Sequence, residues 1–464
     1  MSELITGHVA VLGAGRSGRA VAARLARDAE RGVDVRVTLI DSASGGGLEA
    51  LVAPLRGPFV DVRLGSDMVP EDVTLVVASP GLPPASPLMS AARRIGVPIV
   101  SEIEVAYRLS ESPWIAVTGT NGKTTTTTLI GHILAEAGLP AETVGNIGRA
   151  AASVVGDLGP ATILVAEVSS FQLALTERFH PRVAVLLNIT PDHIDWHGSL
   201  EAYAADKARV FKNLTAGDTA VIDVDDPGSA PYAAPLVEGG VDVRTIGRSA
   251  ADAFGRVEDG MLVLGHGSAR VELVKVEELA IRGDHNISNA LAAAAAAHAV
   301  GVDAGSLREV LRTFQPIEHR LEPVGVVAGV EYFNDSKATN PDAVLKALTA
   351  FDDRPLVILL GGHNKGNDFS ELADAVCDRC RVAVVFGESA AELLSAFESC
   401  DGCDVVEMPS METAVRAAAR VACPGEVVLL SPACASFDEF DDFEHRGRVF
   451  REIVAGMSGM DGRS

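Results

Sequence analysis

The chain has 464 residues, 47% of them apolar and only 5% aromatic, and its formal net charge of −24 comes from 39 basic and 63 acidic side chains. This length exceeds what one hydrophobic core usually supports, so two or three domains are expected. A surface this acidic argues against a general nucleic-acid binder or a binder of anionic membranes, although a local cleft could still hold nucleotide phosphates.

The N-terminal stretch Met1–Ile5 lacks the basic region of a signal peptide, and no apolar run reaches the roughly 18 residues of a membrane span. A cytoplasmic location without membrane insertion is therefore predicted. Six cysteines are too few for a disulfide framework in a chain of this length.

The first predicted strand, His8–Leu12, runs into Gly13-Ala14-Gly15-Arg16-Ser17-Gly18 and an alanine-rich helix. A second strand ends at Asp41, about twenty positions on, which matches the dinucleotide-binding fingerprint. A third strand ends in the turn Ser79-Pro80-Gly81, again at the end of the strand where open α/β sheets bind ligands. The glycines could serve packing alone, but binding of a nucleotide pyrophosphate is favoured.

Ser110–Pro113 is predicted as a hinge into a second domain, where an apolar strand from Trp114 enters a glycine-rich turn and a helix. The turn is Gly119-Thr120-Asn121-Gly122-Lys123-Thr124-Thr125. This pattern indicates a phosphate loop, in which the backbone surrounds phosphate oxygens, Lys123 reaches the terminal phosphates and Thr124 holds Mg²⁺. The first glycine stands three residues before Gly122 rather than five, so the loop is a shortened variant.

Later strands of this domain end in polar residues. Glu167 follows a short strand at the position where a phosphate-loop fold presents an acid to Mg²⁺. The next strand leads into Asn188-Ile-Thr-Pro-Asp192-His193-Ile-Asp195, whose types suit hard cations and phosphate. Asn286 and Asn289 share one face near the start of a predicted helix and could read a base or ribose, or cap the helix.

Strands and helices alternate again after a boundary near Phe314–Glu318, which predicts another doubly wound sheet. Its polar turns include Asn334 to Asn340, Gly361 to Lys365, and Ser431 to Phe437. All three follow apolar strands and should gather along one sheet edge.

Two cysteine pairs, Cys377 with Cys380 and Cys400 with Cys403, have the spacing of a zinc ribbon. The same spacing arises if each pair ends one of two successive helices in a strand–helix repeat. The second interpretation is favoured, so a structural zinc ion is not expected.

Together these motifs make the chain similar to the Mur ligase family over essentially its full length. Val117–Thr124 resembles the family's ATP loop, and Asn188 to His193 with Lys207-Ala-Arg209 resembles its central-domain signature. Asn334 to Asn340 and Leu430 to Phe437 resemble, within the family, the ligases that add D-glutamate.

The resemblance implies an α/β fold of three domains. These are a Rossmann-like domain that binds the UDP-substrate (residues 1–112), a P-loop ATPase-like central domain with a parallel sheet plus a small β part (113–316), and a Rossmann-like domain that binds the incoming amino acid and part of ATP (317–464). It implies an ATP-dependent ligase that adds D-glutamate to UDP-N-acetylmuramoyl-L-alanine through an acyl phosphate, in peptidoglycan precursor synthesis. Two Mg²⁺ ions, small-molecule partners, no nucleic acid and a monomeric state are expected.

The resemblance also implies roles for particular residues. Lys123, Glu167, His193 and Lys207 would be catalytic, with Thr124, Glu167, His193 and a carbamylated Lys207 as metal ligands. ATP would contact Gly119 to Thr125, Asn286, Asn289, Arg320, Asp335 and Lys337. The UDP-substrate would contact Arg16, Ser17, Asp41, Ser42, Ser79, Pro80, Gly81, Asn146 and His193. D-glutamate would contact Thr339, Lys365, Ser436, Phe437 and Phe443.

Three alternatives remain open. The nearest is a ligase of the same family for another amino acid, because only the third-domain motifs separate the two. An NAD-dependent oxidoreductase built on the first domain would leave the third-domain turns unexplained. A catalytically silent nucleotide-binding or scaffold protein would not need Lys123, Glu167, His193 and Lys207 intact.

Overall fold

A computed structural model of the chain describes residues 4–281, 283–314, 318–351, 354–398 and 400–461. These residues form three sheets with intervening helices, which confirms the predicted α/β fold. The chain divides into two compact units. The first contains Met1–Ile189, Trp196–Glu278 and Ser288–Arg312, and the second contains Thr190–Asp195, Leu279–Ile287 and Thr313–Ser464. The domain boundary predicted at residues 316 and 317 lies outside the described residues.

The first sheet of unit 1 is fully parallel and has the strand order β3-β2-β1-β4-β5. The order reverses between β1 and β4, the point at which open α/β sheets hold ligands. Its elements are β1 (Gly7–Leu12), α1 (Arg16–Glu30), β2 (Val35–Asp41), α2 (Gly46–Val52), β3 (Val60–Leu64), β4 (Leu75–Ala78), α3 (Pro87–Ile95), β5 (Ile99–Ser101) and α4 (Glu102–Arg108).

The second sheet of unit 1 has nine strands in the order β14-β13-β12-β11-β10-β9-β6-β8-β7. Its strands are β6 (Trp114–Thr118), β7 (Ala141–Gly145), β8 (Ile163–Glu167), β9 (Val183–Leu186), β10 (Thr219–Asp223), β11 (Asp242–Gly247), β12 (Gly255–Glu258), β13 (Met261–Leu264) and β14 (Val271–Lys275). The pairing of β12, β13 and β14 is antiparallel, whereas β11 and β12 pair in parallel. The small β part is therefore a continuation of the phosphate-loop sheet.

Seven α-helices of the described residues lie between or after the strands of the second sheet in the sequence. They are α5 (Lys123–Glu136), α6 (Ser170–Ala174), α7 (Ile194–His197), α8 (Leu200–Ala208), α9 (Ala233–Glu238), α10 (Asp284–Ala299) and α11 (Ala304–Thr313). Helix α5 begins directly after Gly122, whose φ of 84° is a left-handed conformation that glycine adopts without steric cost. This turn lets the chain pass abruptly from β6 into the helix.

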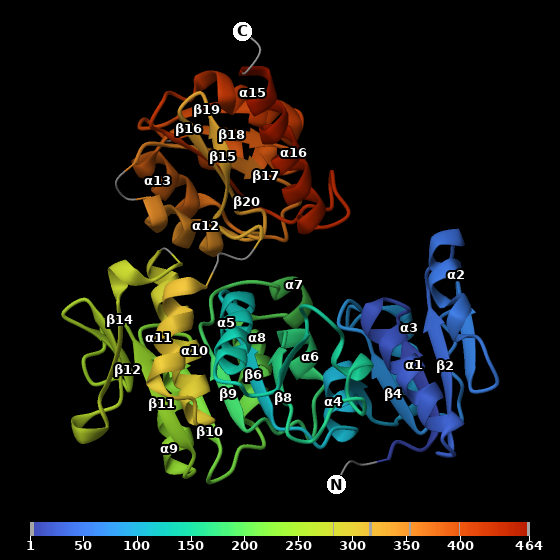
Figure 1. Cartoon of the computed structure of the whole chain (residues 1–464). Coiled ribbons are helices and arrows are strands. Elements are labelled where there is room, and N and C mark those ends of the chain that lie inside the picture. The colour runs from blue at the N-terminus through green and yellow to red at the C-terminus, as the bar shows by residue number, and fades with distance from the viewer. Residues whose placement is uncertain (1–3, 282, 315–317, 352–353, 399, 462–464) are drawn as a thin grey trace. The chain divides into compact units, whose positions relative to one another are not determined.

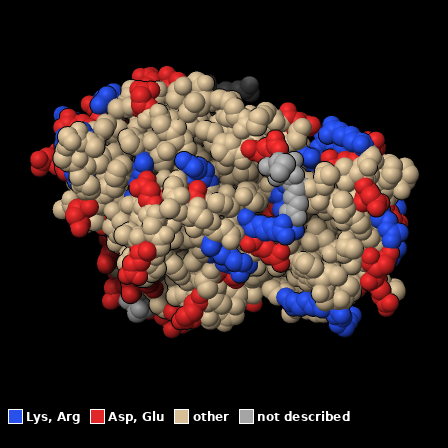
Figure 2. Space-filling view, turned by 90° about the horizontal axis from the view of Figure 1, so that it is seen from below, with Lys and Arg blue, Asp and Glu red and all other residues tan. Residues whose placement is uncertain are grey.

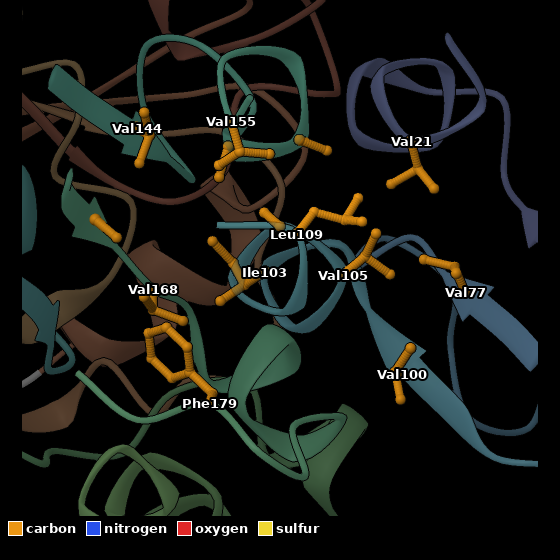
Figure 3. Close-up of a cluster of buried hydrophobic side chains, with 14 of the residues drawn as sticks. Val21, Val77, Val100, Ile103, Val105, Leu109, Val144, Val155, Val168 and Phe179 are labelled. Carbon is orange, nitrogen blue, oxygen red and sulfur yellow. The ribbon is translucent and has the colours of Figure 1, made fainter. Parts of the chain in front are cut away.

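One hydrophobic core runs through both sheets of unit 1 (Figure 3). Val77 lies in β4 of the first sheet and Val21 in α1. Val144 lies in β7 of the second sheet and Val168 directly follows β8. Helix α4 contributes Ile103 and Val105 between them. The predicted hinge at 110–113 is thus flanked by continuous packing. Apolar surface shared in this way resists separation of the two sheets.

Polar contacts reinforce this joint. The Glu104 side chain is fully buried and accepts backbone N–H groups of Glu177, Arg178 and Phe179. Glu102, two residues earlier at the start of α4, accepts the Ala152 N–H at 2.6 Å through Oε1, while its buried Oε2 has no hydrogen-bond partner among the described residues. A carboxylate that is removed from water with one oxygen unpaired is costly when ionised.

Burial raises the pKa of Glu102 to about 7 from 4.5, against the weaker opposing effects of the Ala152 N–H and Arg16. Because the folded pKa is the higher one, the contribution of Glu102 to the free energy of unfolding should be most favourable below pH 4.5 and should fall as the pH rises to about 7. The variant Glu102→Gln should gain up to about 3 kcal/mol over the parent at pH 8 and nothing at pH 4.

Denaturant unfolding followed by tryptophan fluorescence measures this difference, because both tryptophans of the chain, Trp114 and Trp196, belong to unit 1. Glu177→Gln, an exposed acid beside the same joint, is the control and should change little at either pH. If Glu102→Gln differed from the parent in stability by the same amount at pH 4 and at pH 8, the raised pKa of Glu102 would be contradicted.

Unit 2 contains the third sheet, with the order β15-β16-β20-β17-β18-β19. Only the β15–β16 pair is antiparallel. The strands are β15 (Glu322–Val327), β16 (Val330–Asn334), β17 (Leu356–Gly361), β18 (Cys380–Phe386), β19 (Asp404–Met408) and β20 (Val427–Ala433). The helices are α12 (Pro341–Leu348), α13 (Ser370–Arg379), α14 (Ala390–Ala396), α15 (Met411–Val421) and α16 (Phe443–Asp461).

Two separate apolar clusters cover the two faces of this sheet. In Figure 1, α15 and α16 lie on one side of the strands, and α12 and α13 lie on the other. The central strands β17 and β20 are buried along their whole length. This burial on both faces explains why they read as continuous apolar runs.

On the face that Figure 2 shows, basic and acidic side chains of the described residues are interspersed, and the basic ones do not merge into one broad patch. No helix in the described part of the chain is both long and apolar enough to cross a membrane.

Candidate functional site

The predicted phosphate loop lies between β6 and α5. Gly119 and Gly122 have φ values of 150° and 84°, and a Cβ added to Gly122 would lie 2.2 Å from Asn289 Oδ1. Asn289 is itself buried and accepts a hydrogen bond from Thr126 Oγ1 at 3.3 Å. Asn289 therefore packs against the phosphate loop. It does not cap α10, because it is the sixth residue of that helix. The α5 N-terminus gives the loop an intrinsic affinity for anions.

Two lysine ammonium groups meet at this loop. Lys123 Nζ donates to the carbonyl oxygens of Gly119 at 3.0 Å and Thr120 at 2.8 Å. Lys207 Nζ donates to the same Gly119 oxygen at 2.7 Å, although the two lysines are far apart in sequence. Lys207 is only 1% exposed, and its ammonium lies 4.5 Å from the centre of the Tyr203 ring. Two cations beside a helix N-terminus make a strong site for a polyphosphate.

An asparagine holds the other side of the loop. Asn188 Oδ1 accepts the Asn121 N–H at 2.8 Å, and Asn188 Nδ2 donates to the Asn121 carbonyl at 3.1 Å. The Tyr203 hydroxyl is 3.1 Å from Thr120 Oγ1. Sequence analysis gave neither Asn188 nor Tyr203 a role in the loop. The asparagine in the motif after β9 was the signal that could have identified it.

A hydroxyl and a carboxylate with the character of magnesium ligands lie at the start of α5. Thr124 Oγ1 donates to Glu167 Oε2 at 2.7 Å, and Glu167, at the end of β8, is 1% exposed. No group of three or more His, Cys, Asp or Glu that could bind a metal occurs among the described residues. Mg²⁺ needs no such group, since it commonly takes one or two carboxylates with substrate phosphates and water. Thr124 and Glu167 fit that donor set.

The glycine-rich turn of the first sheet is as closely packed as the phosphate loop. A Cβ at Gly18 would lie 1.9 Å from the Gly13 oxygen, so only glycine fits there. Asp41 Oδ2 accepts the Ala14 N–H at 2.7 Å, and Ser79 Oγ donates to the Gly13 oxygen at 3.2 Å. Asp41 therefore shapes the turn directly.

Most other residues predicted for the UDP-substrate in the first sheet lie around this turn. Ser17 lies in the first turn of α1, Ser42 donates to Asp67, and Pro80 and Gly81 follow β4. These positions all lie at the carboxyl ends of β1, β2 and β4, neighbours in the sheet. The structure thus gathers the predicted first-domain residues at the topological switch point.

Arg16, predicted to contact the UDP-substrate, also contacts the second sheet. Its guanidinium donates to the carbonyl oxygens of Gly148 and Asn146, each at 3.1 Å. Both acceptors belong to the turn that follows β7 in the second sheet. Arg16 therefore links the glycine-rich turn of the first sheet to the phosphate-loop sheet.

Unit 2 contains a buried acid from the predicted ATP contacts. Asp335 follows β16, and its Oδ2 accepts the Ser431 hydroxyl at 2.7 Å. Burial raises the pKa of Asp335 to about 7, against the opposing effects of the Ser431 bond and Arg320. Lys337 Nζ lies 5.0 Å from the Phe443 ring centre. Asp335, Lys337 and Phe443 are thus brought together within unit 2.

A buried arginine missed by the sequence analysis supports these turns. Arg446 is 0% exposed and donates to Ser336 Oγ at 3.0 Å, to the Ser336 oxygen at 2.8 Å and to the Cys434 oxygen at 3.1 Å. Burial lowers the pKa of Arg446 to about 10. It ties the turn after β16 to the end of β20, where Ser436 is buried and Phe437 is 71% exposed.

The stretch after β9 contributes to unit 2. Asp192 accepts Lys365 Nζ at 3.2 Å and Asn340 Nδ2 at 3.1 Å, and His193 Nε2 lies 3.6 Å from its carboxylate. Burial alone would raise the pKa of Asp192, but Lys365 and His193 outweigh it and lower that pKa. Lys365 and Thr339 thus lie near an acid of the chain itself, since Thr339 directly precedes Asn340.

The predicted site residues fall in both units. Those in unit 1 are Arg16, Ser17, Asp41, Ser42, Ser79 to Gly81, Gly119 to Thr125, Asn146, Glu167, Lys207 and Asn289. Those in unit 2 are His193, Asn286, Arg320, Asp335, Lys337, Thr339, Lys365, Ser436, Phe437 and Phe443. Their meeting in one active site stays a prediction.

Comparisons with known proteins give the family of the chain. A model of the Mur ligase middle domain matches residues 117–297, and a model of the Mur ligase glutamate ligase domain matches residues 319–434. A UDP-N-acetylmuramoylalanine–D-glutamate ligase from Pelotomaculum thermopropionicum is 44% identical over 97% of this chain and 97% of its own length. The chain belongs to the Mur ligase family.

Other relatives agree with this assignment. A ligase of the same name from Salinibacter ruber is 42% identical over 96% of both chains. Among solved structures, the UDP-N-acetylmuramate–alanine ligase MurC from Thermotoga maritima superimposes with a TM-score of 0.61 at 20% identity, covering 97% of this chain and 99% of its own. MurF from Acinetobacter baumannii gives 0.60 at 16% identity, covering 92% of both. These two structures support the fold of this Mur ligase.

His197 of this Mur ligase, four residues after His193 of the central motif, is a core residue. The His197 side chain is fully buried, with Nδ1 2.8 Å from Asp206 and Nε2 3.0 Å from Ser170. Its ring stacks on Phe171 and packs against Tyr203. Both ring nitrogens are used within the protein, so His197 supports the motif from inside the core.

The four paired cysteines of this Mur ligase do not make the arrangement of a zinc ribbon. Cys377 and Cys400 form a disulfide with a Cα–Cα distance of 5.8 Å. Cys380 and Cys403 are free, and burial raises the pKa of both thiols. Sequence spacing alone could not reveal that the first cysteine of each pair would bond to the other.

Proposed function

We propose that this chain is an ATP-dependent ligase that adds D-glutamate to UDP-N-acetylmuramoyl-L-alanine during peptidoglycan precursor synthesis. The observation that carries the proposal is the phosphate loop with Lys123 and Lys207 on one carbonyl and the Thr124–Glu167 pair beside it. Relatives with that activity in their names, 44% and 42% identical over nearly the whole chain, support the choice of substrates.

The chemistry explains why such a loop is needed. A carboxylate is a poor electrophile, so its oxygen attacks the γ-phosphorus of ATP, ADP leaves, and an acyl phosphate forms. The D-glutamate amine then attacks the acyl carbon, and phosphate leaves with the former carboxylate oxygen. Alignment of the reactants and stabilisation of charge on the transferred phosphoryl group accelerate these steps.

Within unit 1, the loop from Gly119 to Thr125 would hold the ATP phosphates, Lys123 would neutralise their charge, and Asn289 would keep the loop in shape. Thr124 and Glu167 would hold Mg²⁺, which supplies positive charge to the phosphate oxygens when bound. The first sheet would receive the uridine diphosphate on the turn from Gly13 to Gly18, with Asn146 near the muramoyl group.

A second Mg²⁺ would involve His193 and a carbamylated Lys207. Lys207 is buried beside the loop, and its ammonium donates a hydrogen bond to Gly119 O. Carbamylation would replace that donor with a carboxylate-like ligand suited to Mg²⁺. Retention of full activity by Lys207→Ala would exclude this role.

Unit 2 would supply the remaining ATP contacts and the amino-acid pocket. Asn286, Arg320, Asp335 and Lys337 are assigned to ATP. D-glutamate is assigned to Thr339, Lys365, Ser436, Phe437 and Phe443. Lys365 would exchange Asp192 for a substrate carboxylate, since a lysine can pair with either. The domains would comprise residues 1–112, 113–316 and 317–464.

Further parts of the proposal concern the setting of the enzyme. It would act in the cytoplasm as a monomer, on small-molecule substrates and without nucleic acid.

The test is phosphate release with ATP, Mg²⁺ and UDP-N-acetylmuramoyl-L-alanine, with each candidate amino acid added separately. We expect release only with D-glutamate. Release with another amino acid would keep the mechanism and change the substrate. No release with any of them, together with tight NADH binding, would instead favour the oxidoreductase.

A further inference from the structure

The side chain of Asn146 forms a hydrogen bond with the Glu167 carboxylate. The backbone N–H of Asn146 donates to the Glu167 carbonyl at 2.9 Å, and its side-chain Nδ2 donates to Glu167 Oε1 at 2.8 Å. The residue before it, Gly145, is paired with Glu167 in the parallel register of β7 and β8, where a Cβ would lie 2.4 Å from the Glu167 oxygen. The turn after β7 is thus fitted closely against Glu167.

This contact supplies a second hydrogen-bond donor to the Glu167 carboxylate. Thr124 holds Oε2 at 2.7 Å from one side, and Asn146 holds Oε1 from the other. Both donors are neutral, so they stabilise the ionised carboxylate and restrict its rotation without competing for its charge. Partners of this kind commonly orient a metal ligand.

Asn146 is in turn held from the first sheet. Arg16, the first residue of α1, donates to the Asn146 carbonyl and to the Gly148 carbonyl. Arg16 and Asn146 therefore link the glycine-rich turn after β1 to the Glu167 carboxylate at the end of β8. The whole link lies within unit 1.

We infer that Asn146, itself held by Arg16, is a positioning residue that orients the Glu167 carboxylate for the Mg²⁺ of the bound nucleotide. The inference rests on the proposed function, because it assumes that Glu167 is a magnesium ligand. It extends that function by making a turn assigned to the UDP-substrate part of the metal–nucleotide site. Affinity for magnesium nucleotide then depends on Asn146 even when no UDP-substrate is present.

The test is calorimetric titration of ADP into the full chain without UDP-substrate, once with Mg²⁺ and once with EDTA. For Asn146→Ala we expect the gain in ADP affinity on adding Mg²⁺ to shrink about 10-fold, with metal-free binding unchanged. Arg16→Gln should reduce that gain by a smaller factor of about 3, because its contacts are exposed. In a Glu167→Gln background, Asn146→Ala should cause no further loss.

Arg27→Ala is the matched control. Arg27 also comes from α1 and reaches the second sheet's side of the joint, where it pairs with Asp157 at 2.9 Å, without touching Glu167 or Asn146. It should bind ADP like the parent chain in both buffers. If it did not, general loosening of the joint would explain the other variants, and the inference would fail.

Asn146→Ala that binds magnesium ADP as the parent does would overturn the inference and leave the proposed function intact. Equal losses in Mg²⁺ and in EDTA would also overturn it, because they would indicate distortion of the loop. A parent chain that binds no ADP in Mg²⁺ would overturn the proposed function itself.

Discussion

Replacing Lys123 by alanine is expected to lower D-glutamate-dependent phosphate release by about 10³-fold. The Lys123 ammonium donates to two carbonyl oxygens of the phosphate loop, and in the proposed function it neutralises the charge of the ATP phosphates. Removing it would leave the charge that develops on the transferred phosphoryl group without one of the two lysine ammonium groups at the loop. The measurement is steady-state phosphate release at saturating ATP.

Lys212→Ala is the control for loss of a lysine. Lys212 is an exposed residue shortly after α8, and its replacement should leave turnover within about twofold of the parent. The stability of Lys123→Ala, followed by fluorescence of Trp114 and Trp196, should match that of the parent. A stable Lys123→Ala chain with near-normal turnover would show that another group carries the phosphate charge.

Replacing Gly18 by alanine is expected to destabilise unit 1 by about 3 kcal/mol. The new Cβ would lie 1.9 Å from the backbone oxygen of Gly13, and neither backbone segment can move freely, because Asp41 and Ser79 hold the same turn. Binding of the UDP-substrate should be lost with the shape of the turn. Denaturant unfolding detected by tryptophan fluorescence measures the first effect.

Gly15→Ala provides a matched control three residues earlier in the same motif. Gly15 has a φ of −66°, which any residue adopts, and a Cβ there meets no atom within 4 Å. Its stability should stay within about 1 kcal/mol of the parent. Equal losses for the two variants would mean that the close packing of Gly18 does not determine the stability of the turn.

The sequence indicates the buried strands through their apolar runs, whereas two helices with clear cap signals were not predicted. The predicted strand His8–Leu12 became β1, Gly7–Leu12, and five of its six residues are buried, as its apolar sequence indicates. Helices α3 and α15 were missed despite readable cap signals. Ser86 with Pro87 starts the first and Gly96 ends it, and Ser410 with Thr413 forms a capping box at the second.

The candidate site divides in the same way. Gly119, Gly122, Lys123 and Thr124 are neighbours in the chain, so their spacing alone indicates a phosphate loop. The supports of that loop come from distant residues. Asn188 braces its backbone and Asn289 lies beneath Gly122, and such partners depend on the register and packing of strands and helices, which no local pattern contains.

The same limit applies to the resemblance to the Mur ligase family. It transfers roles to positions but says nothing about how this chain holds them. Arg446, for example, lies at the centre of the turns assigned to ATP and D-glutamate, yet in sequence it is one more arginine in a helix. Its importance follows from burial and from the carbonyl groups it satisfies.

In the oxidised chain, the disulfide between Cys377 and Cys400 is a covalent cross-link that the reduced chain lacks. The segment between these cysteines becomes a covalent ring that encloses the whole of β18 and α14. A single cut within that ring would then leave both flanking parts of unit 2 joined, whereas the same cut in the reduced chain would separate them. The fragments produced by one protease would thus report the oxidation state of the molecule.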